Sequence, residues 1–348
     1  MMTAKLKTAV MGATGYSGQE LVRLLLRHPR VEKPALLQRE KEGKSPDLSE
    51  FAPAFSGNGI YPFQSLNFSQ LKRVGVELLF LATPHDVSRS LVPEAIANDL
   101  RVVDLSGAWR LKQGQHRAIY NFEDQNAASA AELTKRAVYG LPELHSDCIA
   151  NAELVANPGC YATSIILALA PLLRAGIVDA EHGVISDSKS GVSGAGKEAN
   201  SRTHFVSVAD NLSAYSVFNH RHLGEIAEQL HLETGKITFT PHLLPIPRGI
   251  LSTIYVQLNR TTNAQEIEDC FESFYGDKPW VRLFVSPQLP QIQFSLHTNY
   301  CDLGFCLDQD GRRLIIVSCL DNLLKGAAGQ AVQNMNLMYG WCEKEGLN

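Results

Sequence analysis

The sequence predicts an α/β protein that begins with a parallel sheet and continues into a second α+β domain with a mixed sheet. The run 7–11, Lys-Thr-Ala-Val-Met, predicts a buried first strand and leads into a glycine turn and an amphipathic helix. The runs 76–83 and 100–105 are rich in apolar residues, which favours parallel strands buried on both faces. A strand, a turn and a helix in this order indicate a Rossmann-type unit.

The second half of the chain has a different pattern. The run 238–258 is strand-like but broken at Arg248-Gly249, and 312–320 predicts another strand. The segment 323–338 predicts a helix with small residues on one face. We therefore expect a dinucleotide-binding domain over 1–158, completed by a C-terminal helix over 323–348, and a catalytic and subunit-contact domain over 159–322.

Composition narrows the classes of function. The 348 residues are 45% hydrophobic and 20% charged, with a net charge of −4 and a pI near 6.3. A slightly negative net charge does not favour binding to nucleic acid or to a membrane surface, so we expect a small-molecule ligand. The seven cysteines have neither disulfide-framework nor metal-site spacing, which favours a reducing cytoplasm and no metal. The longest apolar stretch, 165–178, contains Pro171 and Arg174, so no membrane span is expected.

The glycine turn has the spacing Gly-x-x-Gly-x-x-Gly, a variant of the dinucleotide fingerprint. Glycines let the backbone approach a pyrophosphate while the following helix N-terminus meets its charge. A plain tight turn is the alternative. The candidate cofactor-binding residues here are Gly12, Thr14, Gly15, Tyr16, Ser17 and Gly18.

The end of the second predicted strand, 34–39, bears on cofactor choice. A protein that prefers NAD would place an acid there for the ribose hydroxyls, but this chain has Gln38 and Arg39. A guanidinium suits a 2′-phosphate, so NADP is favoured, with a solvated loop charge as the alternative for Arg39.

Loops after the next two strands should border the cofactor crevice. In the loop after 100–105, Arg110 is a candidate clamp for a substrate carboxylate, or else a structural arginine. The roles of His85 and Arg202 stay open.

Cys160 differs from the other cysteines in its position. It follows Asn157-Pro158-Gly159 and opens a strongly apolar helix. Unpaired N–H groups and the positive end of the helix dipole favour a thiolate there, which makes Cys160 a candidate nucleophile. A buried structural cysteine is the alternative.

The segment 187–197 is rich in glycine and serine and carries Lys189 and Lys197. We expect a loop with many exposed backbone N–H groups that can hold phosphate, either of the substrate or of the cofactor. Its candidate residues are Ser190, Gly191, Ser193 and Lys197.

The segment Asn219-His220-Arg221-His222 opens another predicted helix. On a helix, positions 222 and 225 share a face, so Glu225 can orient the imidazole of His222. With Cys160 these residues form a nucleophilic arrangement. A zinc site at His220 and His222 lacks further ligands at a suitable spacing. Near the C-terminus, Asn322 is a candidate for bonding the nicotinamide amide, with a helix cap as the alternative.

These residues together resemble the N-acetyl-γ-glutamyl-phosphate reductase family of arginine biosynthesis. The matching segments run nearly the length of the chain: 12–18, 139–143, 157–163, 190–197, 220–226 and 321–336. The resemblance implies NADPH as reductant, Cys160 as nucleophile, His222 as acid/base supported by Glu225, and a homodimer or homotetramer. We also expect substrate contacts from Arg110, Asn157, Ser193, Lys197 and His220. Ala108 stands where the family often has an acid, so no role of that acid carries over.

Other functions remain as alternatives. Aspartate semialdehyde dehydrogenase and the aminoadipyl-phosphate reductase of lysine synthesis share the chemistry and differ in acyl chain. A non-catalytic NADP-binding redox sensor belongs to a different class. A short-chain dehydrogenase is excluded because none of the ten tyrosines has a lysine four residues later.

Overall fold

The computed structural model describes residues 4–39, 45–57, 59–124, 126–285 and 287–347. It divides into two compact units. Unit 1 comprises residues 1–112, 120–158 and 327–348, and unit 2 comprises 113–119 and 159–326. The chain therefore crosses between the units four times.

Unit 1 is built on a seven-stranded sheet in the order β3-β2-β1-β4-β5-β7-β6, and every neighbouring pair is parallel. Every residue of β1 and β4 is buried, so both faces of the sheet are covered. This confirms the Rossmann-type prediction. The strands are β1 (Thr8–Met11), β2 (Ala35–Gln38), β3 (Phe63–Ser65), β4 (Leu78–Leu81), β5 (Arg101–Asp104), β6 (Val138–Tyr139) and β7 (Leu154–Ala156).

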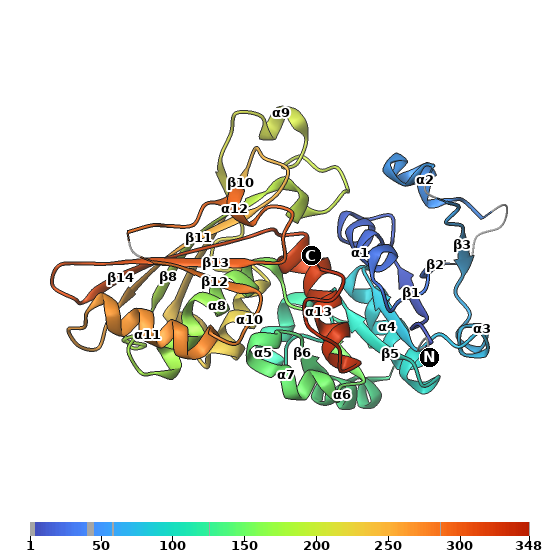
Figure 1. Ribbon diagram of the computed structural model, residues 1–348, viewed down its shortest axis with the longest axis horizontal. Coiled ribbons are helices and arrows are strands. Elements are labelled where there is room, and N and C mark those ends of the chain that lie inside the picture. Colours follow the sequence, from blue (N-terminus) through green and yellow to red (C-terminus); the bar gives the residue numbers. More distant parts are fainter. Residues whose placement is uncertain (1–3, 40–44, 58, 125, 286, 348) are drawn as a thin grey trace. The chain divides into compact units, whose positions relative to one another are not determined.

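The helices of unit 1 are labelled in Figure 1. They are α1 (Tyr16–Arg27), α2 (Leu48–Phe51), α3 (Phe68–Arg73), α4 (His85–Ala97), α6 (Ala127–Arg136), α7 (Pro142–Ala150) and α13 (Gly329–Met338), with a short 3₁₀ turn at Pro53–Phe55. A further 3₁₀ turn, Ala118–Tyr120, spans the point where the chain returns to unit 1. Helix α13 packs against α1 and α7 although it lies near the end of the chain. Oδ1 of its buried Asn336 accepts a hydrogen bond from Nε2 of His28 at 3.0 Å.

Unit 2 is built on a seven-stranded mixed sheet in the order β12-β13-β14-β11-β8-β10-β9. The pairs β8–β10 and β12–β13 are parallel, and the other pairs are antiparallel. The strands are β8 (Val184–Gly191), β9 (Ser213–Ala214), β10 (Ile237–Leu244), β11 (Ile250–Gln257), β12 (Val281–Phe284), β13 (Cys301–Leu307) and β14 (Arg313–Leu320). The predicted mixed sheet is confirmed.

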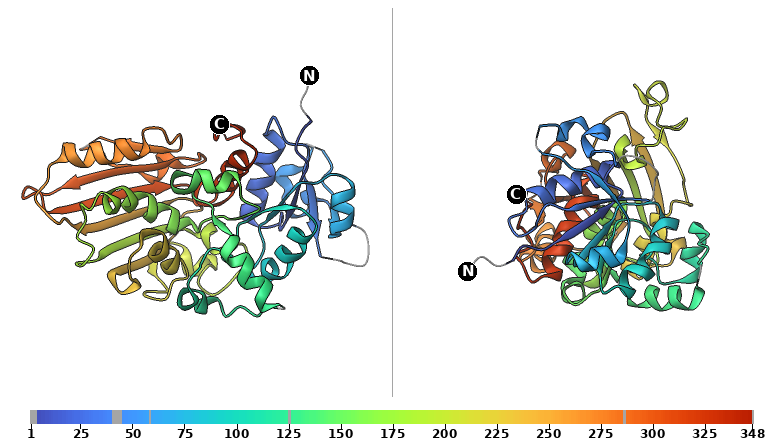
Figure 2. Two further views of the ribbon diagram at one scale, coloured as in Figure 1. Left: turned by 90° about the horizontal axis from the view of Figure 1, so that it is seen from below. Right: turned by 90° about the vertical axis from the view of Figure 1, so that its right-hand side faces the viewer.

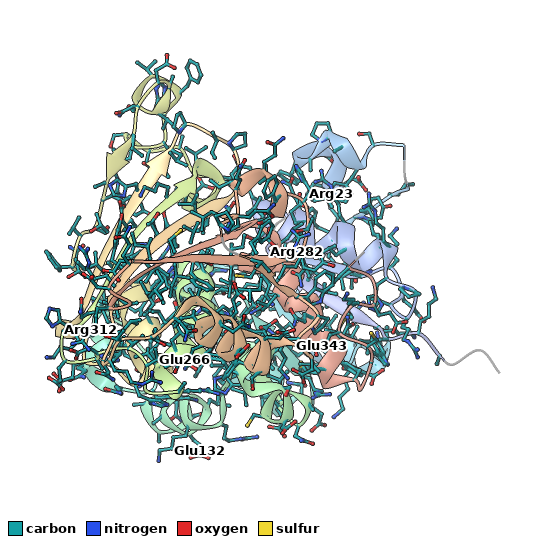
Figure 3. All side chains as sticks on the ribbon, turned by 60° about the vertical axis from the view of Figure 1, so that its left-hand side comes forward. Arg23, Glu132, Glu266, Arg282, Arg312 and Glu343 are labelled. Atoms are coloured by element: carbon teal, nitrogen blue, oxygen red, sulfur yellow. The ribbon has the colours of Figure 1, made fainter. Side chains whose placement is uncertain are left out.

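Helices α8, α10 and α11 lie on the same side of this sheet (Figures 1 and 2). Strand residues that face them alternate with more exposed ones, which is the pattern of a sheet covered on one face. The helices are α5 (Gly114–Arg117), α8 (Cys160–Arg174), α9 (Phe205–Val208), α10 (His222–Leu230), α11 (Ala264–Tyr275) and α12 (Ile292–Ser295), with 3₁₀ turns at Val192–Ala195 and Thr234–Lys236. Charged side chains such as Glu266 of α11 and Arg282 of β12 are labelled in Figure 3.

The structure differs from four expectations about segment boundaries. The segment 113–119 belongs with unit 2, and the chain returns to unit 1 at Ala327 rather than at 323. The C-terminal segment is not one helix over 323–348: a π-helix covers Leu324–Ala328, α13 ends at Met338, and turns follow. Asp187 to Gly191 form the end of β8 rather than a loop, because they pair with β10 and β11.

Candidate functional site

Cys160 is the first residue of helix α8, as the sequence predicts. Gly159 is its N-cap and gives no side-chain cap bond to the first-turn amides. Residues 161–172 of this helix are all buried, while Cys160 itself is only partly buried. The sulfur therefore lies at the positive end of a fixed helix and remains reachable, which suits a nucleophile.

His222 and Glu225 come from helix α10 and lie against the turn that carries Cys160. The Glu225 side chain is fully buried, and its Oε2 accepts the N–H of Gly159 at 2.9 Å. Its Oε1 lies 4.0 Å from Nε2 of His222. A Cβ on Gly159 would stand 2.4 Å from that same Nε2. One carboxylate thus holds the backbone before Cys160 and lies beside the imidazole, and the structure brings all three predicted catalytic residues together.

Gly326 forms another wall beside Cys160, and sequence reasoning did not single it out. A Cβ at this position would stand 2.7 Å from the Cβ of Cys160. Gly326 N–H is bonded to the carbonyl of Asp321 at 3.0 Å, which fixes its backbone. The Asp-Asn-Leu-Leu-Lys-Gly run noted in the sequence was the available signal.

His220 lies in an aromatic cluster next to His222. Its ring centroid is 4.6 Å from that of His222 and 5.7 Å from those of both Tyr161 and Tyr215. Its Nδ1 accepts the N–H of His222 at 3.1 Å. Burial, together with Arg221, lowers the pKa of His220 to about 4, so this imidazole is neutral near pH 7.

Two tyrosines of this cluster were missed by sequence reasoning because nothing in their local sequence marks them. Tyr161 donates its hydroxyl to the carbonyl of His242 at 2.9 Å, and Tyr215 donates to the hydroxyl of Tyr161 at 3.5 Å. Burial raises the pKa of both phenols, that of Tyr215 to about 12. Both therefore remain protonated and available as hydrogen-bond groups.

The segment after β8 does not offer the many free N–H groups that we expected. The amides of Gly191, Val192 and Ser193 are bonded to the carbonyls of residues 249, 246 and 247. Lys189 pairs with Asp187 at 2.7 Å. The prediction of a loop rich in free amides is therefore wrong for 191–193, because a distant turn of unit 2 already occupies them.

The predicted ligand residues of this segment differ in exposure. Ser190 is buried, and its hydroxyl donates to the carbonyl of Gly191 at 3.0 Å, whereas Lys197 is exposed. Ser193 Oγ accepts from Nδ2 of Asn322 at 2.9 Å, and Oδ1 of Asn322 accepts the N–H of Gly249 at 2.7 Å. Asn322 thus joins two loops of unit 2. The cap at this helix start is instead Asp321, whose Oδ1 accepts the amides of 323 and 324.

In unit 1, the glycine turn has the geometry of a dinucleotide loop. Gly12 has a φ of +92°, and a Cβ there would stand 2.2 Å from the carbonyl oxygen of Ala82. A Cβ on Gly18 would stand 2.2 Å from the carbonyl oxygen of Gly12. Gly15 is the N-cap of α1 and provides no side-chain cap, so the first-turn amides face no capping group. Around this turn, Thr14 and Ser17 are partly buried and Tyr16 is exposed.

Arg110 and Asn157 also lie in unit 1, where they fix the backbone at the end of β7. Nε of Arg110 donates to the carbonyl of Asn157 at 2.7 Å, and its NH2 group donates to the carbonyl of Leu105 at 2.7 Å. Oδ1 of Asn157 accepts from Asn334 at 3.0 Å, and its Nδ2 donates to the carbonyl of Ala327 at 3.1 Å. Both residues are buried and have a clear structural role; their contacts with substrate stay predictions.

The remaining candidates have simple surroundings. Arg39 is exposed just after β2. His85 accepts the N–H of Gly107 on Nδ1 at 2.8 Å, and Arg202 lies over the Tyr215 ring at 5.8 Å.

Among the described residues, no three acidic, histidine or cysteine side chains gather as a metal site. Within the same ranges, no helix has the length and apolar character needed to cross a bilayer.

Both halves of the chain match family models. Residues 7–152 match the semialdehyde dehydrogenase NAD binding domain, and residues 160–322 match the semialdehyde dehydrogenase dimerisation domain. The fold and the site thus define an oxidoreductase of the semialdehyde dehydrogenase class.

Curated relatives give the particular family. The chain is 46% identical over 346 residues to the N-acetyl-gamma-glutamyl-phosphate reductase of Desulfotalea psychrophila, with 98% of each chain covered. It is 42% identical over 345 residues to the enzyme of that name from Methanocaldococcus jannaschii, covering 98% of this chain and 97% of the other. The chain belongs to the N-acetyl-gamma-glutamyl-phosphate reductase family, as the sequence motifs indicate.

Solved structures share the fold at low identity. Aspartate semialdehyde dehydrogenase II from Vibrio cholerae, complexed with ASA, has a TM-score of 0.72 at 18% identity and covers 97% of this chain and 99% of that one. Aspartate semialdehyde dehydrogenase with NADP from Candida albicans has a TM-score of 0.68 at 15% identity, with the same coverage.

Proposed function

We propose that this enzyme reduces N-acetyl-γ-glutamyl phosphate to N-acetylglutamate 5-semialdehyde and phosphate in arginine biosynthesis, with NADPH as reductant and a thioester on Cys160. The observation that carries the proposal is the shared carboxylate of Glu225, which binds the Gly159 amide before Cys160 and lies 4.0 Å from His222. The names of the relatives supply the acyl group, and the site supplies the chemistry.

In the first half of the reaction, the Cys160 thiolate attacks the carbonyl carbon of the acyl phosphate. The amides at the start of α8, which no side chain caps, stabilise the developing oxyanion. A carbon–sulfur bond forms, the carbon–oxygen bond to phosphate breaks, and inorganic phosphate leaves. His222 accepts the thiol proton in this scheme, and the Glu225 carboxylate stabilises the resulting imidazolium.

The glycine turn of unit 1 would hold a reduced nicotinamide dinucleotide, which when bound would supply the hydride that the thioester carbonyl carbon accepts. The thiohemiacetal on Cys160 then loses its carbon–sulfur bond, which releases the aldehyde and regenerates the sulfur nucleophile. His222 returns the proton during this collapse. A free carboxylate would not react in this way, because it is a poor acyl donor.

The residues of unit 1 fit a dinucleotide. Gly12 and Gly18 lie where any side chain would clash with backbone, and the uncapped start of α1 can meet a pyrophosphate. We infer NADP rather than NAD because β2 ends in Gln38 and is followed by Arg39, at the position where a protein that prefers NAD would place an acid. Ser190, Gly191 and Asn322 remain proposed cofactor contacts of unit 2.

The match of 160–322 to a dimerisation domain supports a homo-oligomer, and we propose a homodimer or homotetramer. Light scattering on the eluting protein tests this. A mass of two or four chains is expected, and a monomer at assay concentrations would overturn the proposal.

The reaction is tested in the oxidative direction. The purified enzyme, N-acetylglutamate 5-semialdehyde, phosphate and NADP⁺ should form NADPH only when phosphate or arsenate is present. Aspartate and aminoadipate semialdehydes are the comparison substrates, and a higher kcat/KM for either would change the acyl assignment. Cys160→Ser should lower the rate by at least about a thousandfold while NADP⁺ still binds. No phosphate-dependent turnover with any of the three aldehydes would leave only a non-catalytic NADP-binding role.

A further inference from the structure

Helix α10 carries a third buried polar side chain, Glu228, which has no role in the proposed mechanism. His222, Glu225 and Glu228 follow one another at three-residue spacing. Glu228 has a side chain that is only 6% exposed. Its Oε1 accepts the backbone N–H of Gln113 at 2.9 Å and lies 2.9 Å from Nδ1 of His116, whose side chain is 8% exposed.

The partners of Glu228 come from a separate part of the chain. Residues 113–119 form a strap that belongs to unit 2, although the chain on both sides of it belongs to unit 1. Helix α5 of this strap packs against α10. A buried carboxylate must find donors to offset its desolvation, and the strap supplies the Gln113 amide and the His116 imidazole.

At the start of α10, Nδ1 and the carbonyl oxygen of His220 accept the N–H groups of His222 and Leu223 at 3.1 and 2.9 Å. Its N-cap, Arg221, makes no side-chain cap bond, and His222 is the first helical residue. Beyond these bonds and its packing on α8, two carboxylates of α10 anchor the helix to other segments. Glu225 binds the turn of Cys160, and Glu228 binds the strap.

We propose that Glu228 is a positioning residue, which acts through α10 to hold the His222 imidazole against Gly159, with His116 as its partner in the strap. This inference rests on the proposed function of His222 as acid/base. Loss of the anchor would let α10 shift, and displacement of a catalytic group by about 1 Å can lower the rate by about a hundredfold. Substrate and cofactor contacts would remain, so the effect belongs in kcat rather than KM.

The experiment compares Glu228→Ala, Glu228→Gln and His116→Ala in the whole enzyme. Glu228→Ala should lower kcat about tenfold or more, with KM for the aldehyde and for NADP⁺ within twofold of wild type. Glu228→Gln keeps an oxygen acceptor for Gln113 and should recover most of kcat. The control is His182→Ala, which removes an exposed imidazole 3.8 Å from Asp179 in the same unit and should change nothing.

Each outcome decides the question. A folded Glu228→Ala enzyme with wild-type kcat overturns the inference, and so does a loss that appears in KM alone. If Glu228→Ala does not fold, the His116→Ala enzyme tests the inference, because this variant leaves the bond from Gln113 to Glu228 in place. A fivefold or greater fall in its kcat supports the inference, and an unchanged kcat overturns it. If the wild-type enzyme shows no phosphate-dependent turnover, the proposed function fails first, and the two failures are thereby distinguished.

Discussion

Replacing Gly159 by alanine tests the geometry of the site directly. The backbone of Gly159 has φ −76° and ψ 147°, which alanine adopts without strain. The added Cβ, however, would stand 2.4 Å from Nε2 of His222, whereas ordinary contacts begin near 3.4 Å. The imidazole must therefore move by about 1 Å, because the turn itself is held by Glu225.

A shift of this size should lower kcat by about a hundredfold, which corresponds to about 2.7 kcal/mol of transition-state stabilisation. The assay follows NADPH formation from the semialdehyde, phosphate and NADP⁺. A second readout is the pH dependence of Cys160 labelling by iodoacetamide, which should move to higher pH when the imidazole is displaced. Gly235→Ala is the matched control, since its added Cβ meets nothing within 4 Å in the same unit.

The reasoning would be refuted by a Gly159→Ala enzyme that keeps kcat within threefold of wild type and the same labelling profile. Such a result would mean that the imidazole is not needed where it stands. A loss of rate in Gly235→Ala of equal size would also refute it, because that change touches no site residue.

Three further predictions follow from other parts of the structure. The pKa of His220 is lowered from 6.5 to about 4, so the unfolded chain binds more protons than the folded chain between these two pH values. The free energy of unfolding should therefore fall by on the order of 3 kcal/mol as the pH drops through this window. Urea unfolding of His220→Asn should show a smaller fall. Arg39→Ser should raise KM for NADP⁺ about tenfold or more without changing the rate with NAD⁺, as measured by steady-state kinetics, and equal effects on both cofactors would exclude a 2′-phosphate contact. Gly18→Ala should destabilise unit 1, because its Cβ would meet the carbonyl oxygen of Gly12 at 2.2 Å. In Gly15→Ala the Cβ would lie 3.6 Å from the same oxygen, so the melting temperature should not change. Equal melting temperatures for both variants would contradict this prediction.

Local motifs in the sequence predicted much of what the structure shows. The strand, glycine turn and helix at 7–27 are set by neighbouring residues, and so is the placement of Cys160 at a helix start. The relation between His222 and Glu225 follows from helical spacing alone. These features needed no knowledge of the tertiary fold.

The remaining features depend on contacts between distant segments. The bond from Gly159 to Glu225 joins residues 66 positions apart, and no spacing rule anticipates it. The amides of 191–193 were expected to be free because the turn at 246–249 that occupies them lies far along the chain. The strap at 113–119 was assigned to the wrong unit for the same reason. Glycine content predicts a flexible backbone, but only the fold decides which amides stay open.

The return of the chain to unit 1 at Ala327 has a consequence for how the protein is made. Helix α13 packs on α1 and α7, and the carbonyl of Met338 accepts a hydrogen bond from Arg101 at 2.5 Å. A ribosome releases residues 327–348 only after all of unit 2, so the Rossmann-type sheet, although synthesised first, cannot complete its packing until unit 2 has been made. Premature termination anywhere in unit 2 would therefore yield a chain in which neither unit is whole, and such fragments would be ready substrates for proteolysis.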